Sequence, residues 1–266
     1  LHSDVTLIRN SLRTTGNIII AENEVQPWLD QIRIFGFHMM HLDIRQDSSV
    51  YAEVMNDIWK ATGKHDHPQG LEEVQRQELL LSTLGSEIRL GELILEEGTS
   101  RTLELFTVMR RTARVYGMAA LGGHVVSMTR TPSDLLTVLW LCNWSESIDG
   151  GDAQDGHSQL PLVPLFETIQ DLKNADATLS SLLSDPVYRE YLKQQGNNQT
   201  IMIGYSDSTK DGGYLAGQWG LYDSQSRMAK VADQFGVNLT FFHGRGGSLG
   251  RGGGPAAKSV LSLPKD

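Results

Sequence analysis

The stretch LPLVPLFETIQDLKNADATLSSLL (160–183) decides the fold. Its first part, 160–167, is a short apolar run rich in branched and aromatic residues, which is typical of a buried strand. The second part, 168–183, has a helical pattern that Thr168 can cap at its start. A buried strand followed directly by a helix is the unit from which parallel β/α folds are built.

The same unit recurs on both sides of this stretch. Further strands are predicted at 34–45 (IFGFHMMHLDIR), 124–130 (HVVSMTR), 200–207 (TIMIGYSD) and 237–245 (VNLTFFHGR). Between them the sequence predicts a helix capped by Asp47 or Ser48 and ending at Gly63, one from Ser100 to Gly117, one with Pro132 just inside its start, and one over about 211–235.

The strand ends are regularly spaced. From the second strand onward they fall at Arg130, Glu167, Asp207 and Arg245, which are 37, 40 and 38 residues apart. Such units imply parallel strands joined by crossovers, in a barrel or a doubly wound sheet. We therefore expect an α/β fold with predominant helix, a helical excursion at 48–118 after the first strand, and a mobile surface loop at 145–159.

Composition excludes several classes of protein. The net charge of -9 argues against a nucleic-acid binder, which needs a basic face. The apolar runs are far shorter than the ~20 residues of a membrane helix, so no membrane partner is expected. The single cysteine, Cys142, makes no internal disulfide and is expected to serve packing, which favours a reducing compartment and a cytoplasmic protein.

The stretch FHGRGGSLGRGGGPA (242–256) follows the last strand and contains seven glycines. It is not a P-loop, because GxxxxGK[ST] is absent, and the acidic chain disfavours an RNA-coating segment. Glycines allow backbone N–H groups to approach an anion, so 243–255 is predicted to be an active-site loop that closes over a reacting group.

Charged residues end the predicted strands, where parallel β/α folds place their active sites. Glu167 and Asp207 are hard oxygen ligands suited to Mg²⁺ or Mn²⁺, although both could instead be helix caps. The cations Arg45, Lys210, Arg245 and Arg251 suit a small polyanion. For Arg45 an ion pair with Asp43 or Asp47 remains an alternative, and Arg130 could equally be a solvated residue before a helix.

Five stretches in this order carry a family resemblance: HLDIRQDS, VVSMTRTPSDLL, PLVPLFET, GYSDSTKDGGYLAGQW and FHGRGGSLGRGGGP. They resemble the central part of phosphoenolpyruvate carboxylase, over nearly the whole chain. The resemblance implies an incomplete (β/α) barrel of the phosphoenolpyruvate-binding TIM-barrel type. It also implies carboxylation of phosphoenolpyruvate by bicarbonate to oxaloacetate and phosphate, with Mg²⁺ (or Mn²⁺), in a homo-oligomer, by resemblance a tetramer.

The resemblance also assigns residue roles. It implies that Glu167 and Asp207 hold the metal and that Arg45 and Arg245 grip the substrate phosphate. The catalytic set is His243 and Lys210, near bicarbonate and carboxyphosphate, together with Arg251 on the glycine loop. In the family the matching loop arginine also contacts acidic feedback inhibitors, so an inhibitor that holds Arg251 would remove it from the active site.

Parts of the family pattern are missing. No TAHPTE-like stretch with its catalytic histidine is present, and neither are the C-terminal strands that would complete the barrel. We therefore expect the chain to be a fragment of a carboxylase that is inactive in isolation. The alternative is a naturally shortened, non-catalytic paralogue that acts as an anion-binding or regulatory module.

Overall fold

The computed structural model describes residues 1–36, 39–86, 88, 90, 93–148, 160–244 and 263–264. Five parallel strands form one sheet in the order β1-β2-β3-β4-β5. The strands are β1 (Leu42–Asp47), β2 (Leu121–Ser127), β3 (Leu162–Phe166), β4 (Asn198–Gly204) and β5 (Asn238–Gly244). The strands lie side by side in the same order as in the sequence, as they do in a β/α barrel. In a doubly wound sheet the strand order would reverse partway through the sheet. The expected fold is therefore confirmed as a mostly helical α/β structure with an open parallel sheet, consistent with a partial β/α barrel.

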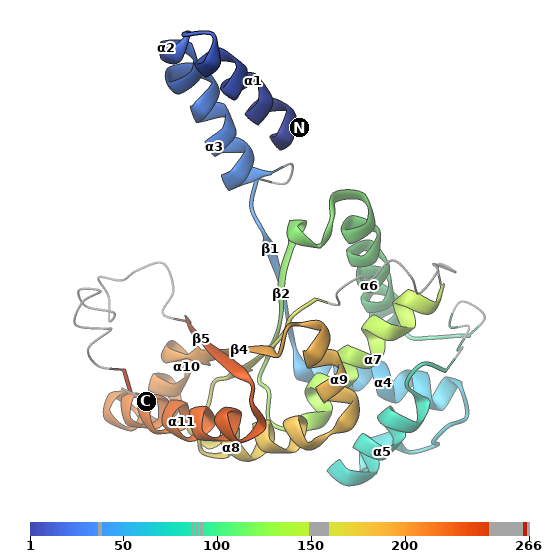
Figure 1. Cartoon of the computed structure of the whole chain (residues 1–266). Coiled ribbons are helices and arrows are strands. Elements are labelled where there is room, and N and C mark those ends of the chain that lie inside the picture. The colour runs from blue at the N-terminus through green and yellow to red at the C-terminus, as the bar shows by residue number, and fades with distance from the viewer. Residues whose placement is uncertain are drawn as a thin grey trace.

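Helices connect all the strands (Figure 1). Before β1 lie α1 (His2–Thr14), α2 (Ile18–Ile20), a π-helical turn (Ala21–Val25) and α3 (Gln26–Phe35). Between β1 and β2 lie α4 (Ser48–Ala61), η2 (Pro68–Gly70), α5 (Glu73–Thr83), α6 (Glu97–Tyr116) and η4 (Met118–Ala120). The later crossovers contain α7 (Pro132–Ile148), α8 (Ile169–Ser184), α9 (Pro186–Gln194), α10 (Tyr205–Gly212) and α11 (Tyr214–Phe235).

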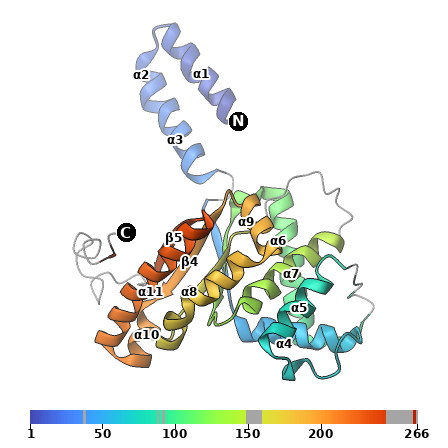
Figure 2. The same ribbon diagram turned by 60° about the horizontal axis from the view of Figure 1, so that its bottom comes forward.

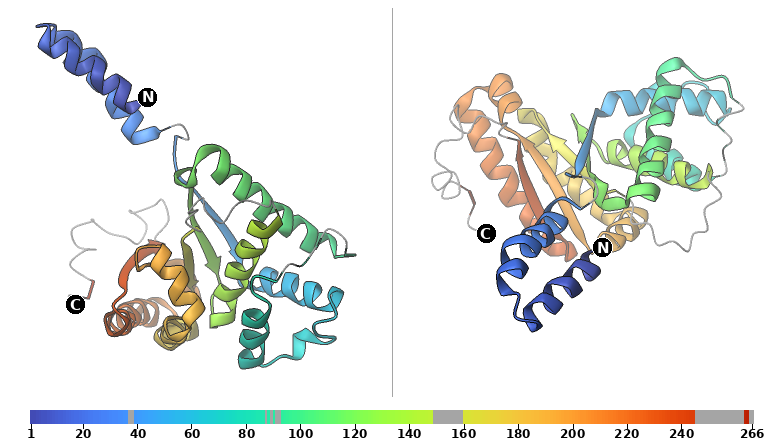
Figure 3. Two further views of the ribbon diagram at one scale, coloured as in Figure 1. Left: turned by 45° about the vertical axis from the view of Figure 1, so that its right-hand side comes forward. Right: turned by 90° about the horizontal axis from the view of Figure 1, so that it is seen from above.

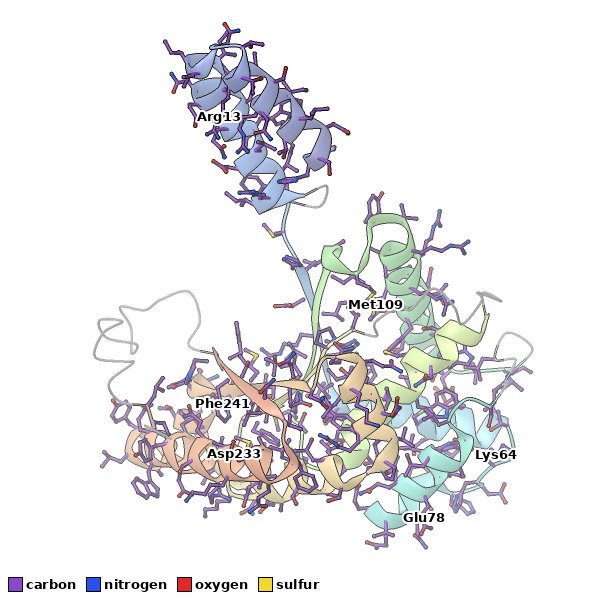
Figure 4. The ribbon with its side chains drawn as sticks, in the orientation of Figure 1. Arg13, Lys64, Glu78, Met109, Asp233 and Phe241 are labelled. Atoms are coloured by element: carbon purple, nitrogen blue, oxygen red, sulfur yellow. The ribbon has the colours of Figure 1, made fainter. Side chains whose placement is uncertain are left out.

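The first three helices stand away from the rest of the molecule (Figures 1 and 3). They have a small core of their own, made of Val5, Val25 and Leu29. Arg13, labelled in Figure 4, lies on these projecting helices. The strand predicted at 34–45 is wrong in its first half, because 34–35 end α3 and the strand begins only at Leu42.

The sheet buries different residues on its two faces, as the alternation of strand side chains requires. Ile201 and Ile203 of β4 belong to the main core, which the helices share. Val163 and Leu165 of β3 belong to a smaller cluster, on the opposite face. Figure 2 shows α8 and α11 running alongside β4 and β5, and these two helices pack against each other. The main core therefore lies between sheet and helices.

Helix boundaries test the predicted caps. Asp47 caps α4, Pro132 is the first residue of α7, and Thr168 forms a capping box with Asp171 at the start of α8, as the sequence indicates. The helix start predicted at Ser100 is wrong, because α6 begins at Glu97. The backbone N–H of its N-cap residue, Glu96, donates to the Asp57 carboxylate of α4.

Two predicted loops lie largely outside the described residues. Of 145–159, residues 145–148 are the end of α7 and 149–159 lie outside the description. Of 243–255, only His243 and Gly244 are described, as the end of β5. In the portion that is described, no helix is both long and apolar enough to cross a membrane.

Candidate functional site

Polar side chains gather where the strands end. Arg45 lies in the last half of β1, Glu167 directly follows β3, Asp207 and Lys210 lie on α10 directly after β4, and His243 is the penultimate residue of β5. The carboxyl ends of parallel strands share one edge of a sheet, so these residues lie on one side of the fold.

Glu167 is held through both carboxylate oxygens. Its side chain is 5% exposed, Arg45 Nη2 lies 3.0 Å from Oε1, and the backbone N–H of Met128 donates to Oε2 at 2.8 Å. Met128 has a positive φ of 55°, which is costly for a residue with a side chain, and the Ser48 hydroxyl donates to its carbonyl oxygen at 2.9 Å. The turn after β2 is thus fixed in a conformation that points an N–H group at Glu167.

The alternative pairing of Arg45 with a near neighbour in sequence is wrong. Asp43 accepts a hydrogen bond from the backbone N–H of Gly123 at 2.9 Å, and Asp47 accepts from the backbone and hydroxyl of Ser49. Arg45 pairs instead with Glu167, which is 122 residues away in sequence, and its own side chain remains 52% exposed. This cation therefore lies at the strand ends with one face open to an incoming anion.

Glu167 and Asp207 lie close enough to affect each other. Burial raises the pKa of Glu167, the charge of Asp207 raises it further, and the Met128 N–H group and Arg45 oppose the rise. Lys210 Nζ lies 3.0 Å from Asp207 Oδ1. The site therefore holds two carboxylates side by side, each flanked by a cation.

A glycine leaves room for this arrangement. A Cβ atom at Gly204 would lie 3.1 Å from Cγ and 3.3 Å from Cα of Glu167, closer than most real contacts. Gly204 is the last residue of β4 and the N-cap of α10. The absence of a side chain there lets Glu167 occupy the space beside the start of α10.

The carboxylate pair fits a hard divalent cation. Mg²⁺ is usually held by one or two carboxylates, with waters and substrate oxygens as its other ligands. Neither acid is an N-cap: Thr168 caps α8, and α10 has Gly204 at that position. Among the described residues, no group of three or more His, Cys, Asp or Glu side chains is placed to hold a metal ion.

A second polar pair lies on the neighbouring strand. The Tyr205 hydroxyl oxygen is 2.7 Å from His243 Nδ1, and the two ring centroids are 5.8 Å apart. Ile203 of β4 lies opposite His243 of β5, so Tyr205 emerges from the sheet beside the imidazole. Helix α10 therefore contributes to both polar clusters: it carries Asp207 and Lys210 beside Glu167, and Tyr205 beside His243.

Three predicted residues lie elsewhere or outside the description. Arg130 Nε is 3.9 Å from Asp171 Oδ1, and its carbonyl oxygen accepts a hydrogen bond from the Thr178 hydroxyl, so it faces α8 and is 63% exposed. Arg245 and Arg251 lie outside the described residues.

Sequence reasoning missed two contributors to the site, the Met128 backbone and Tyr205. Nothing in the sequence indicates the positive φ of Met128. Tyr205 could have been found, because it stands between the end of a predicted strand and Asp207.

Known proteins share the sequence over this whole region. The family model described as Phosphoenolpyruvate carboxylase matches residues 1–266. The phosphoenolpyruvate carboxylase of Mycobacterium avium (strain 104) is 37% identical over 266 residues, which cover 99% of this chain and 28% of that protein.

Two further relatives give the same result. The phosphoenolpyruvate carboxylase of Thermosynechococcus vestitus is 39% identical over 270 residues, covering 98% of this chain and 26% of that protein. The phosphoenolpyruvate carboxylase of Xanthomonas campestris pv. campestris (strain 8004) is 38% identical over 265 residues, which cover 100% of this chain and 28% of that protein. The chain thus spans little more than a quarter of the length of these relatives. It belongs to the phosphoenolpyruvate carboxylase family.

Proposed function

We propose that this chain forms the metal- and phosphate-binding part of a phosphoenolpyruvate carboxylase and acts within a longer polypeptide. The observation that carries the proposal is the pairing of Glu167 with Asp207 at the strand ends, flanked by Arg45 and Lys210, in a chain of this family. The reaction joins bicarbonate to phosphoenolpyruvate through carboxyphosphate and the enolate of pyruvate, and yields oxaloacetate and phosphate.

Glu167 and Asp207 would hold Mg²⁺ or Mn²⁺, and the bound cation would supply positive charge that stabilises the enolate oxygen. Arg45 is half exposed and would grip the phosphate together with Arg245, reducing its repulsion toward the incoming bicarbonate. A guanidinium has five donors, so Arg45 could contact phosphate and keep a bond to Glu167.

Lys210 and His243 would lie near bicarbonate and carboxyphosphate, and Arg251 would steady the transferring group. The Lys210 side chain is 72% exposed and reaches Asp207 from α10, so it is available to an anion on that side. An acidic inhibitor that binds Arg251 would remove this charge from the reaction. We further propose that the whole protein is a cytoplasmic homotetramer.

The isolated chain is expected to convert little or no substrate. The family's catalytic histidine in a TAHPTE-like stretch is not among its residues, and Arg45 and Arg245 supply only part of the phosphate contacts. Carboxyphosphate formation and the transfer of its carboxyl group would therefore lack an acid–base group.

Two measurements test the proposal. An immunoblot of source-cell lysate, with an antibody against this chain, should show a band several times heavier than 29.4 kDa. The purified heavy protein should form oxaloacetate from phosphoenolpyruvate, bicarbonate and Mg²⁺, followed by coupled NADH oxidation. A native band near 29.4 kDa that lacks this activity would contradict the proposal and favour the non-catalytic module.

A further inference from the structure

Both carboxylate oxygens of Glu167 are held from one short segment of the chain, residues 45–48. Arg45 contacts Oε1 directly, at 3.0 Å. Ser48 reaches the other oxygen through an intermediate residue: its hydroxyl donates to the carbonyl oxygen of Met128 at 2.9 Å, and the Met128 N–H donates to Oε2 at 2.8 Å. The end of β1 and the start of α4 therefore act together on one side chain.

The start of α4 leaves the Ser48 hydroxyl free for this contact. Ser48 is the first residue of the helix and is buried, but the cap is supplied by Asp47, which accepts the hydrogen bond from the N–H of Ser49. Serine hydroxyls commonly bond to backbone groups close to them in sequence. The Ser48 hydroxyl instead bonds to a residue 80 positions away, so it ties α4 to the turn after β2.

The turn at Met128 needs such a tie. Its φ of 55° lies in the left-handed region, which a residue with a side chain keeps only where its surroundings hold it. The peptide group between Met128 and Thr129 is held at both ends, because its carbonyl oxygen accepts from Ser48 and its N–H donates to the Leu165 carbonyl oxygen of β3 at 3.1 Å. Without the serine hydroxyl, only the contact to β3 would resist rotation of this peptide group.

The orientation of Glu167 depends on that turn. A carboxylate that binds a cation must direct an oxygen lone pair toward it, and residues that bond to a metal ligand orient it for this purpose. Arg45 on Oε1 and the Met128 N–H on Oε2 fix the plane of the Glu167 carboxylate. Each carboxylate oxygen can accept more than one bond, so a metal could still be bound.

We propose that Ser48 is a positioning residue for Glu167: its hydroxyl holds the Met128 turn that directs the Met128 N–H to Oε2, and so orients the carboxylate for a divalent cation. The metal part rests on the function proposed above. The positioning part rests on the contacts among these three residues alone. Helix α4 begins the helical excursion between β1 and β2, so the excursion, and not only the strand ends, sets the geometry of the site.

The positioning part is tested without metal, on the 266-residue chain labelled with ¹⁵N-methionine, whose eight methionines give few amide signals. The Met128 signal is identified by its loss in Met128→Leu. A hydrogen bond to a charged carboxylate is strong and moves an amide proton downfield, so Glu167→Gln should move the Met128 proton upfield. Ser48→Ala should move it in the same direction, because the turn no longer directs the N–H to Oε2.

Ser49→Ala is the matched control. Ser49 is the next residue and is exposed, and its hydroxyl donates to Asp47 at 2.7 Å, so its loss should leave the Met128 signal unchanged. A Met128 signal at the wild-type position in Ser48→Ala would overturn the positioning role, and so would equal displacements in Ser48→Ala and Ser49→Ala. Identical Met128 signals in wild type and Glu167→Gln would overturn it even if Ser48→Ala fails to fold.

Calorimetric titration with Mn²⁺ tests the metal part. Removing a group that bonds to a metal ligand typically weakens metal binding about 10–100-fold. Ser48 acts through a second residue, so we expect Ser48→Ala to weaken Mn²⁺ binding at least about threefold and Ser49→Ala to leave it unchanged.

A double variant tests the route through the backbone. Met128→Gly removes the steric cost of the left-handed conformation, so Ser48→Ala should weaken Mn²⁺ binding less in that background than in wild type. An equal loss in both backgrounds would show that Ser48 does not act through the Met128 turn.

The proposed function and this inference fail separately. A wild-type chain that binds no Mn²⁺ would refute the metal site, while the amide spectra would still decide the positioning role of Ser48. Wild-type binding that Ser48→Ala leaves unchanged would keep the metal site and refute the role of Ser48 in it.

Discussion

Acid should loosen the helices between β1 and β2 from the sheet, because their packing includes a buried neutral histidine. His124 of β2 is fully buried, its Nε2 lies 2.5 Å from the Tyr51 hydroxyl of α4, and its ring stacks on Phe106 of α6. Burial lowers the pKa of His124 from 6.5 to about 4. Among the described residues, Nδ1 of His124 has no hydrogen-bond partner, so a proton added there would have no acceptor.

The direction of the effect follows from proton uptake. Between about pH 6.5 and pH 4 the unfolded chain binds a proton at His124 that the folded chain does not, so stability falls as pH falls through this window. Below about pH 4 both states are protonated and the loss from His124 is complete. At 1.36 kcal/mol per pKa unit, the full loss in the free energy of unfolding is about 3 kcal/mol, of which about 2 kcal/mol is reached between pH 7 and pH 5.

Urea unfolding at pH 7 and pH 5 measures this loss. His124→Gln removes the titrating group but keeps an amide that can bond the Tyr51 hydroxyl. In this variant the difference in the free energy of unfolding between pH 7 and pH 5 should be about 2 kcal/mol smaller than in wild type, although the variant is less stable at pH 7. His67→Gln, at an exposed site, should keep the wild-type difference. Equal losses in wild type and His124→Gln would refute the reasoning.

Three further substitutions test the site and its support. Glu167→Gln keeps the size of the side chain but removes one of the two negative charges that would bind the metal, so it should weaken Mn²⁺ binding at least about tenfold in calorimetric titration. Glu190→Gln, at an exposed site, should leave Mn²⁺ affinity unchanged. Unchanged affinity in Glu167→Gln would reject the metal assignment. Gly204→Ala should also weaken Mn²⁺ binding, because its Cβ would press on Glu167, and an unaltered Mn²⁺ affinity would count against this crowding argument. Its control is Gly220→Ala on α11, where a Cβ would meet Leu172 of α8 at an ordinary 3.4 Å and should raise stability by about 0.5–1 kcal/mol. Arg227→Lys should lower the free energy of unfolding by about 1–3 kcal/mol in urea, because the guanidinium of Arg227 donates to two backbone carbonyls of α8 and pairs with two carboxylates; a loss below about 0.5 kcal/mol would show that these contacts contribute little.

The periodic part of the fold could be predicted from the sequence. Apolar runs of fixed spacing place β2 to β5 within a few residues, and the caps at Asp47 and Thr168 are read directly from residue type. The strand at 34–45 was misplaced because Ile34 and Phe35 are apolar at the end of an exposed helix, where composition alone does not separate helix from strand.

The site could be predicted in position but not in its contacts. Strand ends identify Glu167 and Asp207 as neighbours, because topology brings them together. The pairing of Arg45 with Glu167 could not be predicted, since it depends on how the strands are placed across the sheet, and local charges suggested Asp43 or Asp47 instead. Backbone donors such as the Met128 N–H group leave no mark on residue type.

The break between α10 and α11 sets how far the chain travels after β4. An unbroken helix over residues 205–235 would be ~46 Å long at 1.5 Å per residue, well beyond the ~30 Å width of a small domain. Gly213, with φ 82° and ψ 167°, turns the chain after two turns of helix, a conformation that residues with a side chain rarely adopt. The short helix α10, before the turn, keeps Tyr205, Asp207 and Lys210 over the strand ends. The long helix α11, after the turn, packs along α8 and leads the chain back to the start of β5.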